Sequence, residues 1–135
     1  MFPISTEYTN VRMADLTISM IINNAGYTIE RAIHGANQTY NDIAPYDFSH
    51  MLSLFGQPTC TEGPDRNFRQ ARTEQEFEAA MSEDVIVDPK QVQVIEVFMD
   101  RLDIPWQLAA LLKNRIPGCK EYYDREGFVY SEEPV

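Results

Sequence analysis

The first clear pattern along the chain is a short apolar run at residues 18–22, which polar residues and then a helical pattern follow. The run is rich in β-branched side chains and predicts a buried β-strand. A helix is expected to start at Thr28 or Ile29 and to end at Gly35, a good C-terminal signal. Asn-Asn-x-Gly between the two elements places polar groups at the carboxyl edge of a sheet, where open α/β sheets bind ligands. The backbone N–H groups that begin the helix favour a phosphate there.

Two further segments have the pattern of strands. Residues 92–99 form an apolar run that is too continuous for a strand with one face in water, and Glu96 interrupts it in the strand interior. Residues 68–72 are a shorter and weaker strand candidate. Helical patterns lie between and after these strands, so the expected class is α/β with a parallel sheet.

Helix signals mark three more segments. Asp47 is a candidate N-cap for a helix over residues 48–55, and Thr73 with Glu76 has the spacing of a capping box. Pro105 suits the first turn of a helix over residues 106–115.

Composition narrows the classes of function. The chain has 135 residues, 44% of them hydrophobic, and a formal net charge of −10 from 11 basic and 21 acidic residues. This acidity argues against binding DNA, RNA or an anionic membrane surface, because such binding depends on Lys and Arg. No apolar run approaches the ~20 residues that span a bilayer, and no secretory signal is visible. Cys60 and Cys119 have neither metal-ligand nor disulfide-framework spacing, so reduced thiols in a cytoplasmic protein are expected.

Three motifs carry a family resemblance. NNAGYTIER at residues 23–31 is followed by IHG at residues 33–35 and YNDI at residues 40–43. Together and in this order they resemble the cofactor-binding C-terminal domain of thiamine-diphosphate-dependent 2-oxo-acid decarboxylases, the family of pyruvate and indolepyruvate decarboxylases. The resemblance covers residues 16–56 and continues more loosely to about residue 105.

The resemblance implies a Mg²⁺ site. Two of its ligands match the side-chain oxygen of Asn24 and the backbone carbonyl of Gly26. Oxygen ligands in near-octahedral geometry are what Mg²⁺ requires, and it usually bridges protein to phosphate. Ala25 departs from the family, in which many members carry a polar residue there; the departure is expected to be tolerated, because the flanking residues supply the ligands.

The resemblance also implies the catalytic and cofactor-binding positions. Glu30 matches the glutamate that handles protons near the reacting carbon, and Ile29 matches a residue that lines the substrate pocket. A carboxylate in a largely apolar pocket has a raised pKa, which suits acid–base work near neutral pH. The positions implied to bind thiamine diphosphate are Asn24, Gly26, Tyr27, Thr28 and Ile29.

Taken one at a time, these residues have simpler explanations. Asn-Asn-Ala-Gly is a good turn, and a glutamate in a first helical turn is favoured by the helix dipole alone. His34 is expected to have a structural role. The whole string in register favours the family interpretation.

The resemblance also implies that much of the site lies elsewhere. The first glycine is Gly26, so the family's upstream Gly-Asp-Gly motif, with its aspartate ligand, is absent, as is the N-terminal domain. Residues 5–15 are expected to end the helix that follows this motif. We therefore expect residues 1–117 to be an incomplete thiamine-diphosphate-binding domain, the C-terminal part of a doubly wound parallel sheet flanked by helices. So few strands leave a bare sheet edge, so the chain is expected to dock onto the missing half, to cover the edge with residues 1–15 or to self-associate. Glu96 is expected at an edge or interface of that sheet.

Residues 118–135 form an acidic, aromatic tail that either folds back on the domain or docks on a partner. Two functional hypotheses stay open. The chain is a C-terminal fragment of a decarboxylase that converts a 2-oxo acid to an aldehyde and CO₂ and is inactive alone, or it is a non-catalytic interaction module. A homo-oligomer, or association with an intact relative, is expected in either case.

Overall fold

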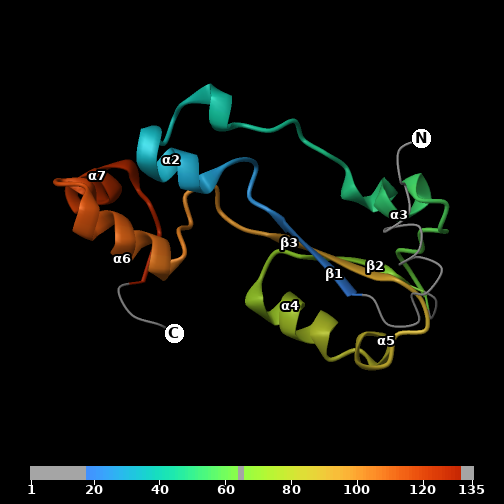
Figure 1. Cartoon of the computed structure of the whole chain (residues 1–135). Coiled ribbons are helices and arrows are strands. Elements are labelled where there is room, and N and C mark those ends of the chain that lie inside the picture. Colours follow the sequence, from blue (N-terminus) through green and yellow to red (C-terminus); the bar gives the residue numbers. More distant parts are fainter. Residues whose placement is uncertain (1–17, 64–65, 132–135) are drawn as a thin grey trace. The chain divides into compact units, whose positions relative to one another are not determined.

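The computed structural model describes residues 18–63 and 66–131, which fall into two compact units (Figure 1). The first, here called the sheet unit, comprises the chain up to Asn23 together with Tyr46–Phe98. The second, the helical unit, comprises Asn24–Pro45 and the chain from Met99 onward. Among the described residues, no helix has the length and apolar character needed to cross a membrane.

The sheet unit is built on three parallel strands in the order β1-β3-β2. They are β1 (Ile18–Asn23), β2 (Phe68–Ala71) and β3 (Gln93–Phe98). All three match predicted strands, and β1 and β3 pair directly, with Ile21 opposite Glu96. The predicted α/β class with a parallel sheet is confirmed.

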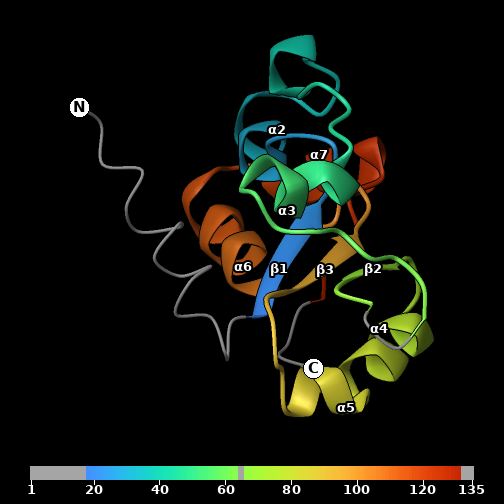
Figure 2. The same cartoon turned by 90° about the vertical axis from the view of Figure 1, so that its right-hand side faces the viewer.

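Helices cover both faces of this sheet, as in a doubly wound fold (Figure 2). On one face, α4 (Glu74–Met81) and α5 (Asp84–Val87) bury Ala80 and Ile86 against Ile95 of β3. On the other, the 3₁₀ turn η2 (Phe48–His50) and α3 (Met51–Leu54) pack against β2 and β3 around Leu52. Each fully buried aliphatic side chain contributes about 1.5–3 kcal/mol to stability.

The predicted burial of β1 is wrong for one of its faces. Met20 and Ile22 are 52% and 63% exposed, although they lie in the apolar run. The reason is strand order: β1 lies at the edge of the sheet, and β3 is its only neighbour among the described strands. Among the described strands, β1 has no neighbour on its other side. The prediction for residues 5–15 lies outside the described residues.

The predicted position of Glu96 is also wrong. It lies in the central strand, not at an edge or interface, and is 2% exposed. Asn23 Nδ2 donates to its Oε1 at 2.6 Å and Gln70 Nε2 to its Oε2 at 2.8 Å. The polar ends of two neighbouring strands thus make this carboxyl group compatible with burial.

Local capping signals were predicted correctly. The Thr73 hydroxyl accepts from the Glu76 N–H and the Glu76 carboxylate from the Thr73 N–H, which completes the capping box of α4. The Asp47 carboxylate accepts from the Ser49 N–H at 3.0 Å. The helix that it was predicted to cap is divided into η2 and α3.

The helical unit contains α2 (Thr28–His34), the 3₁₀ turn η1 (Thr39–Asn41), α6 (Trp106–Arg115) and α7 (Cys119–Glu126), and the three α-helices lie together in Figure 1. Its core joins the helices and the segments after them: Ala32, Ala36, Ile104, Ala109, Leu112, Cys119, Tyr123 and Phe128. The rings of Tyr123 and Phe128 have centroids 5.0 Å apart. The described part of the aromatic tail therefore folds back onto α2 and α6.

Candidate functional site

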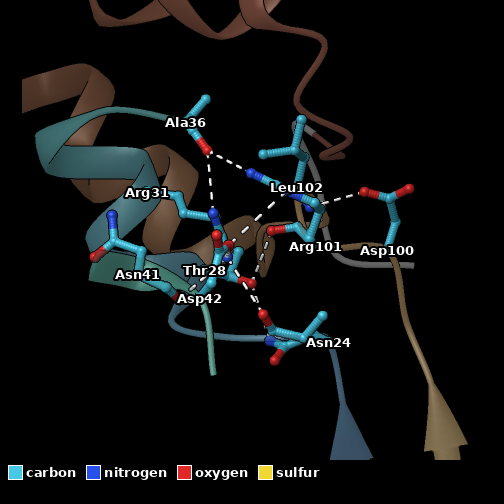
Figure 3. Close-up of polar contacts among 10 residues, drawn as sticks. Asn24, Thr28, Arg31, Ala36, Asn41, Asp42, Asp100, Arg101 and Leu102 are labelled. Carbon is cyan, nitrogen blue, oxygen red and sulfur yellow. Dashed lines mark hydrogen bonds and ion pairs between the residues drawn. The ribbon is translucent and has the colours of Figure 1, made fainter. Parts of the chain in front are cut away.

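Asn24 follows β1 directly and is held by the start of α2 (Figure 3). Its Nδ2 donates to Thr28 Oγ1 at 2.9 Å, and Thr28 Oγ1 donates to the Arg101 carbonyl at 3.0 Å. Thr28 is buried, so its hydroxyl supports Asn24 from inside the unit. Because the amide nitrogen of Asn24 makes this hydrogen bond, the amide oxygen is the side-chain atom left to act as an acceptor.

The turn after Asn24 has an unusual backbone. Ala25 has a φ of +57°, in the left-handed region that favours glycine, and Gly26 has a φ of +149°. The Tyr27 N–H donates to the Asn41 carbonyl at 2.9 Å, as part of an isolated antiparallel bridge between Gly26 and Asp42. The Gly26 carbonyl is not the acceptor in this hydrogen bond.

Gly26 has no room for a side chain. A Cβ built there would lie 2.0 Å from the Asn41 carbonyl oxygen and 2.6 Å from Arg31 Nη2. The backbone therefore approaches its neighbours as closely as only glycine permits. The resemblance assigns a backbone ligand to this residue, and the geometry independently requires glycine.

Arg31 is the site residue that sequence reasoning missed. It is 0% exposed, and its guanidinium donates to the carbonyls of Ala25, Ala36 and Asn41 and to the Asp42 carboxylate. The sequence carried no signal for this burial, because Ile29, Ala32 and Ile33 mark a different apolar face of the helix. In the structure, α2 instead buries Thr28, Arg31 and Ala32.

Asp42 carries the charge opposite Arg31. Its Oδ1 lies 2.6 Å from Arg31 Nη2 and 4.0 Å from Arg101 Nη1. The hydrogen bond from Arg31 holds the pKa of the Asp42 carboxyl below its ordinary value, and the charges of Arg31 and Arg101 act in the same direction.

The side chains predicted to meet substrate and cofactor are on the surface of the described structure. The Glu30 side chain is 45% exposed, and its Oε2 lies 3.4 Å from His34 Nε2, one helical turn later. Tyr27 and Ile29 are 58% and 48% exposed. The apolar pocket expected around Glu30 is not formed by the described residues.

The donors present fit Mg²⁺ in kind. The Asn24 amide oxygen and the Gly26 carbonyl are hard oxygen ligands, and Mg²⁺ takes about six of these. In residues 18–63 and 66–131, no cluster of three or more His, Cys, Asp or Glu side chains could hold a metal ion. Two oxygens would supply only part of the set of about six that the ion takes.

Comparison with known proteins identifies relatives of the chain. No protein-family model matches it. It is 39% identical to a pyruvate decarboxylase of Aspergillus parasiticus over 99 residues. This aligned stretch is 73% of this chain and 17% of that protein. It is 36% identical to an alpha-keto-acid decarboxylase of Mycobacterium leprae over 97 residues, and this stretch covers 71% of this chain and 16% of that protein. A pyruvate decarboxylase of Candida albicans is 32% identical over 97 residues, 72% of this chain and 16% of that protein.

The chain thus spans less than a fifth of the length of these relatives. Their names agree with the family to which NNAGYTIER, IHG and YNDI point. Over the matched stretch, the chain is homologous to a segment of the pyruvate and alpha-keto-acid decarboxylases.

Proposed function

We propose that this chain contributes part of the cofactor site of a 2-oxo-acid decarboxylase that depends on thiamine diphosphate and Mg²⁺. The observation that carries the proposal is the turn at residues 24–26, which is held in shape within the helical unit and contains both implied metal ligands. The names of the relatives support the class of reaction, the conversion of a 2-oxo acid to an aldehyde and CO₂.

In this proposal Asn24 and Gly26 hold the cation. The Asn24 amide oxygen and the Gly26 carbonyl would each donate a lone pair to Mg²⁺, and the Thr28 hydroxyl keeps the Asn24 amide in orientation. When bound, thiamine diphosphate supplies the electron sink that decarboxylation needs. The exposed side chains of Tyr27 and Ile29 offer apolar surface to the cofactor and substrate.

Glu30 is the acid–base residue in this proposal. Its half-exposed carboxyl, beside the imidazole of His34, is accessible to a ligand. We assign it the transfer of a proton to or from the reacting carbon. An enclosing apolar pocket then has to come from residues outside the described part of the chain.

The chain by itself is proposed to bind thiamine diphosphate weakly or not at all and to decarboxylate nothing. Two oxygens are about a third of the ligands that Mg²⁺ takes. The apolar side chains of Met20 and Ile22 at the edge of β1 support association with further protein, as a homo-oligomer or with an intact relative. Turnover of pyruvate by purified, homogeneous chain would contradict this part of the proposal.

A chimera tests the assignment of residues. The matching stretch of this chain replaces its counterpart in the Aspergillus parasiticus relative, and pyruvate decarboxylation is measured against Mg²⁺ concentration. We expect an active chimera in which Asn24→Ala raises the Mg²⁺ requirement and Glu30→Gln removes most activity while thiamine diphosphate still binds. Glu78→Gln, a change at an exposed glutamate of α4, is the matched control.

Two outcomes would contradict the proposal. One is Glu30→Gln activity equal to that of the Glu78→Gln control. The other is a folded chimera, with the oligomeric state of the parent enzyme, that lacks activity; this result favours the non-catalytic interaction module.

A further inference from the structure

We propose that Arg31 is a positioning residue, whose buried guanidinium holds the turn at residues 24–26 in the geometry needed to present the oxygens of Asn24 and Gly26. The meaning of those oxygens as metal ligands rests on the proposed function. The guanidinium clamp itself is a property of the folded chain and is testable without any ligand.

The burial of Arg31 is the first step of the argument. Arginine is almost never fully buried unless it is paired, because an unpaired charge is strongly disfavoured away from water. Here the side chain is 0% exposed, on the same face of α2 as Thr28 and Ala32. Such a residue is held in place by its acceptors and holds them in turn.

The acceptors of one nitrogen lie on two separate backbone segments (Figure 3). Arg31 Nη2 donates to the Ala25 carbonyl at 3.3 Å on one side, and to the Asn41 carbonyl at 3.1 Å and Asp42 Oδ1 at 2.6 Å on the other. Its two hydrogens are shared among three oxygens. A single group therefore ties the turn to the segment that pairs with it.

The position of Nη2 also explains the fit with Gly26. A Cβ on Gly26 would lie 2.6 Å from this nitrogen, so the guanidinium occupies space that any other residue would fill. The glycine lets the backbone come close, and the arginine bonds to the residue on one side of it. Gly26 and Arg31 therefore stabilise the turn together: the glycine leaves the space, and the guanidinium fills it.

The second nitrogen anchors the clamp to the end of α2. Arg31 Nη1 donates to the Ala36 carbonyl at 3.2 Å, and Arg101 Nη2 donates to the same oxygen at 2.9 Å. A planar guanidinium reaches acceptors in several directions at fixed geometry, whereas a lysine ammonium is a single point donor. A lysine at this position would keep the positive charge but lose the separate nitrogen donors that reach acceptors on different segments.

Amide hydrogen exchange on the full 135-residue chain tests the clamp. The reporter is the Tyr27 N–H, which is bonded to the Asn41 carbonyl across the turn. We expect Arg31→Lys and Arg31→Met to speed its exchange by at least about tenfold, since local opening exposes this bond. The Val94 N–H, bonded to the Asn67 carbonyl in the sheet unit, should be unaffected.

Arg69 provides the matched control. It is also a buried arginine, 4% exposed, and its guanidinium is bonded to Glu83 and Gln93 in the sheet unit. Arg69→Lys should leave Tyr27 exchange unchanged. Asp42→Asn, which keeps the guanidinium, should have a smaller effect than Arg31→Lys and gives a readout if Arg31→Met does not fold. Tyr27 exchange within about twofold of wild type in a folded Arg31→Lys variant would overturn the clamp.

The Mg²⁺ dependence of the chimera tests what the clamp is for. With Arg31→Lys we expect the Mg²⁺ concentration for half-maximal activity to rise by about tenfold, with the KM for pyruvate changed much less. Faster Tyr27 exchange with an unchanged Mg²⁺ requirement in an active chimera would overturn the positioning role. Faster exchange with an inactive unsubstituted chimera would leave the clamp supported and count against the proposed function alone.

Discussion

The α-carbon of Gly26 lies so close to the carbonyl of Asn41 that a Cβ on residue 26 would stand 2.0 Å from the Asn41 oxygen. This contact brings the turn after β1 against the segment that begins at η1. The Tyr27 N–H also donates a hydrogen bond to the Asn41 carbonyl across this contact, at 2.9 Å. The glycine is therefore required by packing, whatever ligand its carbonyl holds.

Gly26→Ala is expected to destabilise the chain by about 3 kcal/mol, because the new methyl group meets backbone that cannot move aside and φ is +149°. Urea unfolding measures the loss. Gly127→Ala is the control: Gly127 also has a positive φ, +79°, but nothing lies within 4 Å of its Cβ position, so it should lose only about 1 kcal/mol. Equal losses at the two glycines would contradict the packing argument.

At position 25, asparagine is expected to give a more stable chain than the natural alanine. Its φ of +57° costs a residue with a Cβ about 1 kcal/mol, and asparagine adopts this region more readily. Ala25→Asn should stabilise the chain by about 0.5 kcal/mol, and the β-branched Ala25→Val should destabilise it by more than that. In thermal unfolding, the melting temperature should decrease from Asn to Ala to Val at position 25. Any other order would argue against a left-handed backbone conformation at this residue.

Glu96→Gln is expected to destabilise the sheet unit by about 1–3 kcal/mol, although glutamine has nearly the same shape. The two carboxylate oxygens accept from Asn23 and Gln70, and a glutamine places an N–H₂ group against one of these donors. Chemical unfolding should show this loss, with the exposed Glu78→Gln within about 0.5 kcal/mol of wild type. A neutral Glu96→Gln would mean that the buried acceptor is not needed.

The neighbouring tyrosines of α7 should respond in opposite ways to loss of the hydroxyl. The Tyr122 hydroxyl accepts from the Ala36 N–H at 2.7 Å and donates to the Arg31 carbonyl at 3.2 Å, so Tyr122→Phe should cost about 1–3 kcal/mol. The Tyr123 hydroxyl is buried, makes no hydrogen bond of ordinary geometry among the described residues and has only the weakly bonding Cys119 thiol beside it as a partner; burial raises its pKa. Tyr123→Phe should therefore be neutral or stabilising in the same unfolding assay, and a loss equal to that of Tyr122→Phe would contradict this.

The ion pair of Arg31 and Asp42 predicts a dependence on pH. The pKa of Asp42 is lowered by Arg31, so the unfolded chain binds more protons between the folded and the ordinary pKa values. The stabilising contribution is complete above the ordinary carboxyl pKa and is lost as the pH falls through the lowered value. Carboxyl ¹³C NMR should show Asp42 titrating below the ordinary range, and Arg31→Met should return its pKa upward. An Asp42 titration that is the same in both proteins would contradict the pairing.

Local elements followed from local pattern. The capping box of Thr73 and Glu76, the strand within residues 92–99 and the helix that begins after Pro105 are all present, because hydrogen bonds and side-chain spacing within a few residues decide them. A turn at Asn24 and Gly26 was likewise recognisable, since Asn and Gly adopt turn conformations that most other residues avoid.

Strand order and the partners of buried charges were decided only by the tertiary structure. Nothing within residues 92–99 specifies that β3 is central, so Glu96 was predicted at an edge, and β1 was predicted to be buried although its face at Met20 is open. Arg31 is buried because acceptors at Asn41 and Asp42, ten and eleven residues later, fold back onto it. Periodicity tells which side of an element is apolar, but the atoms that satisfy a buried charge come from elsewhere in the chain, and only the folded backbone brings them together.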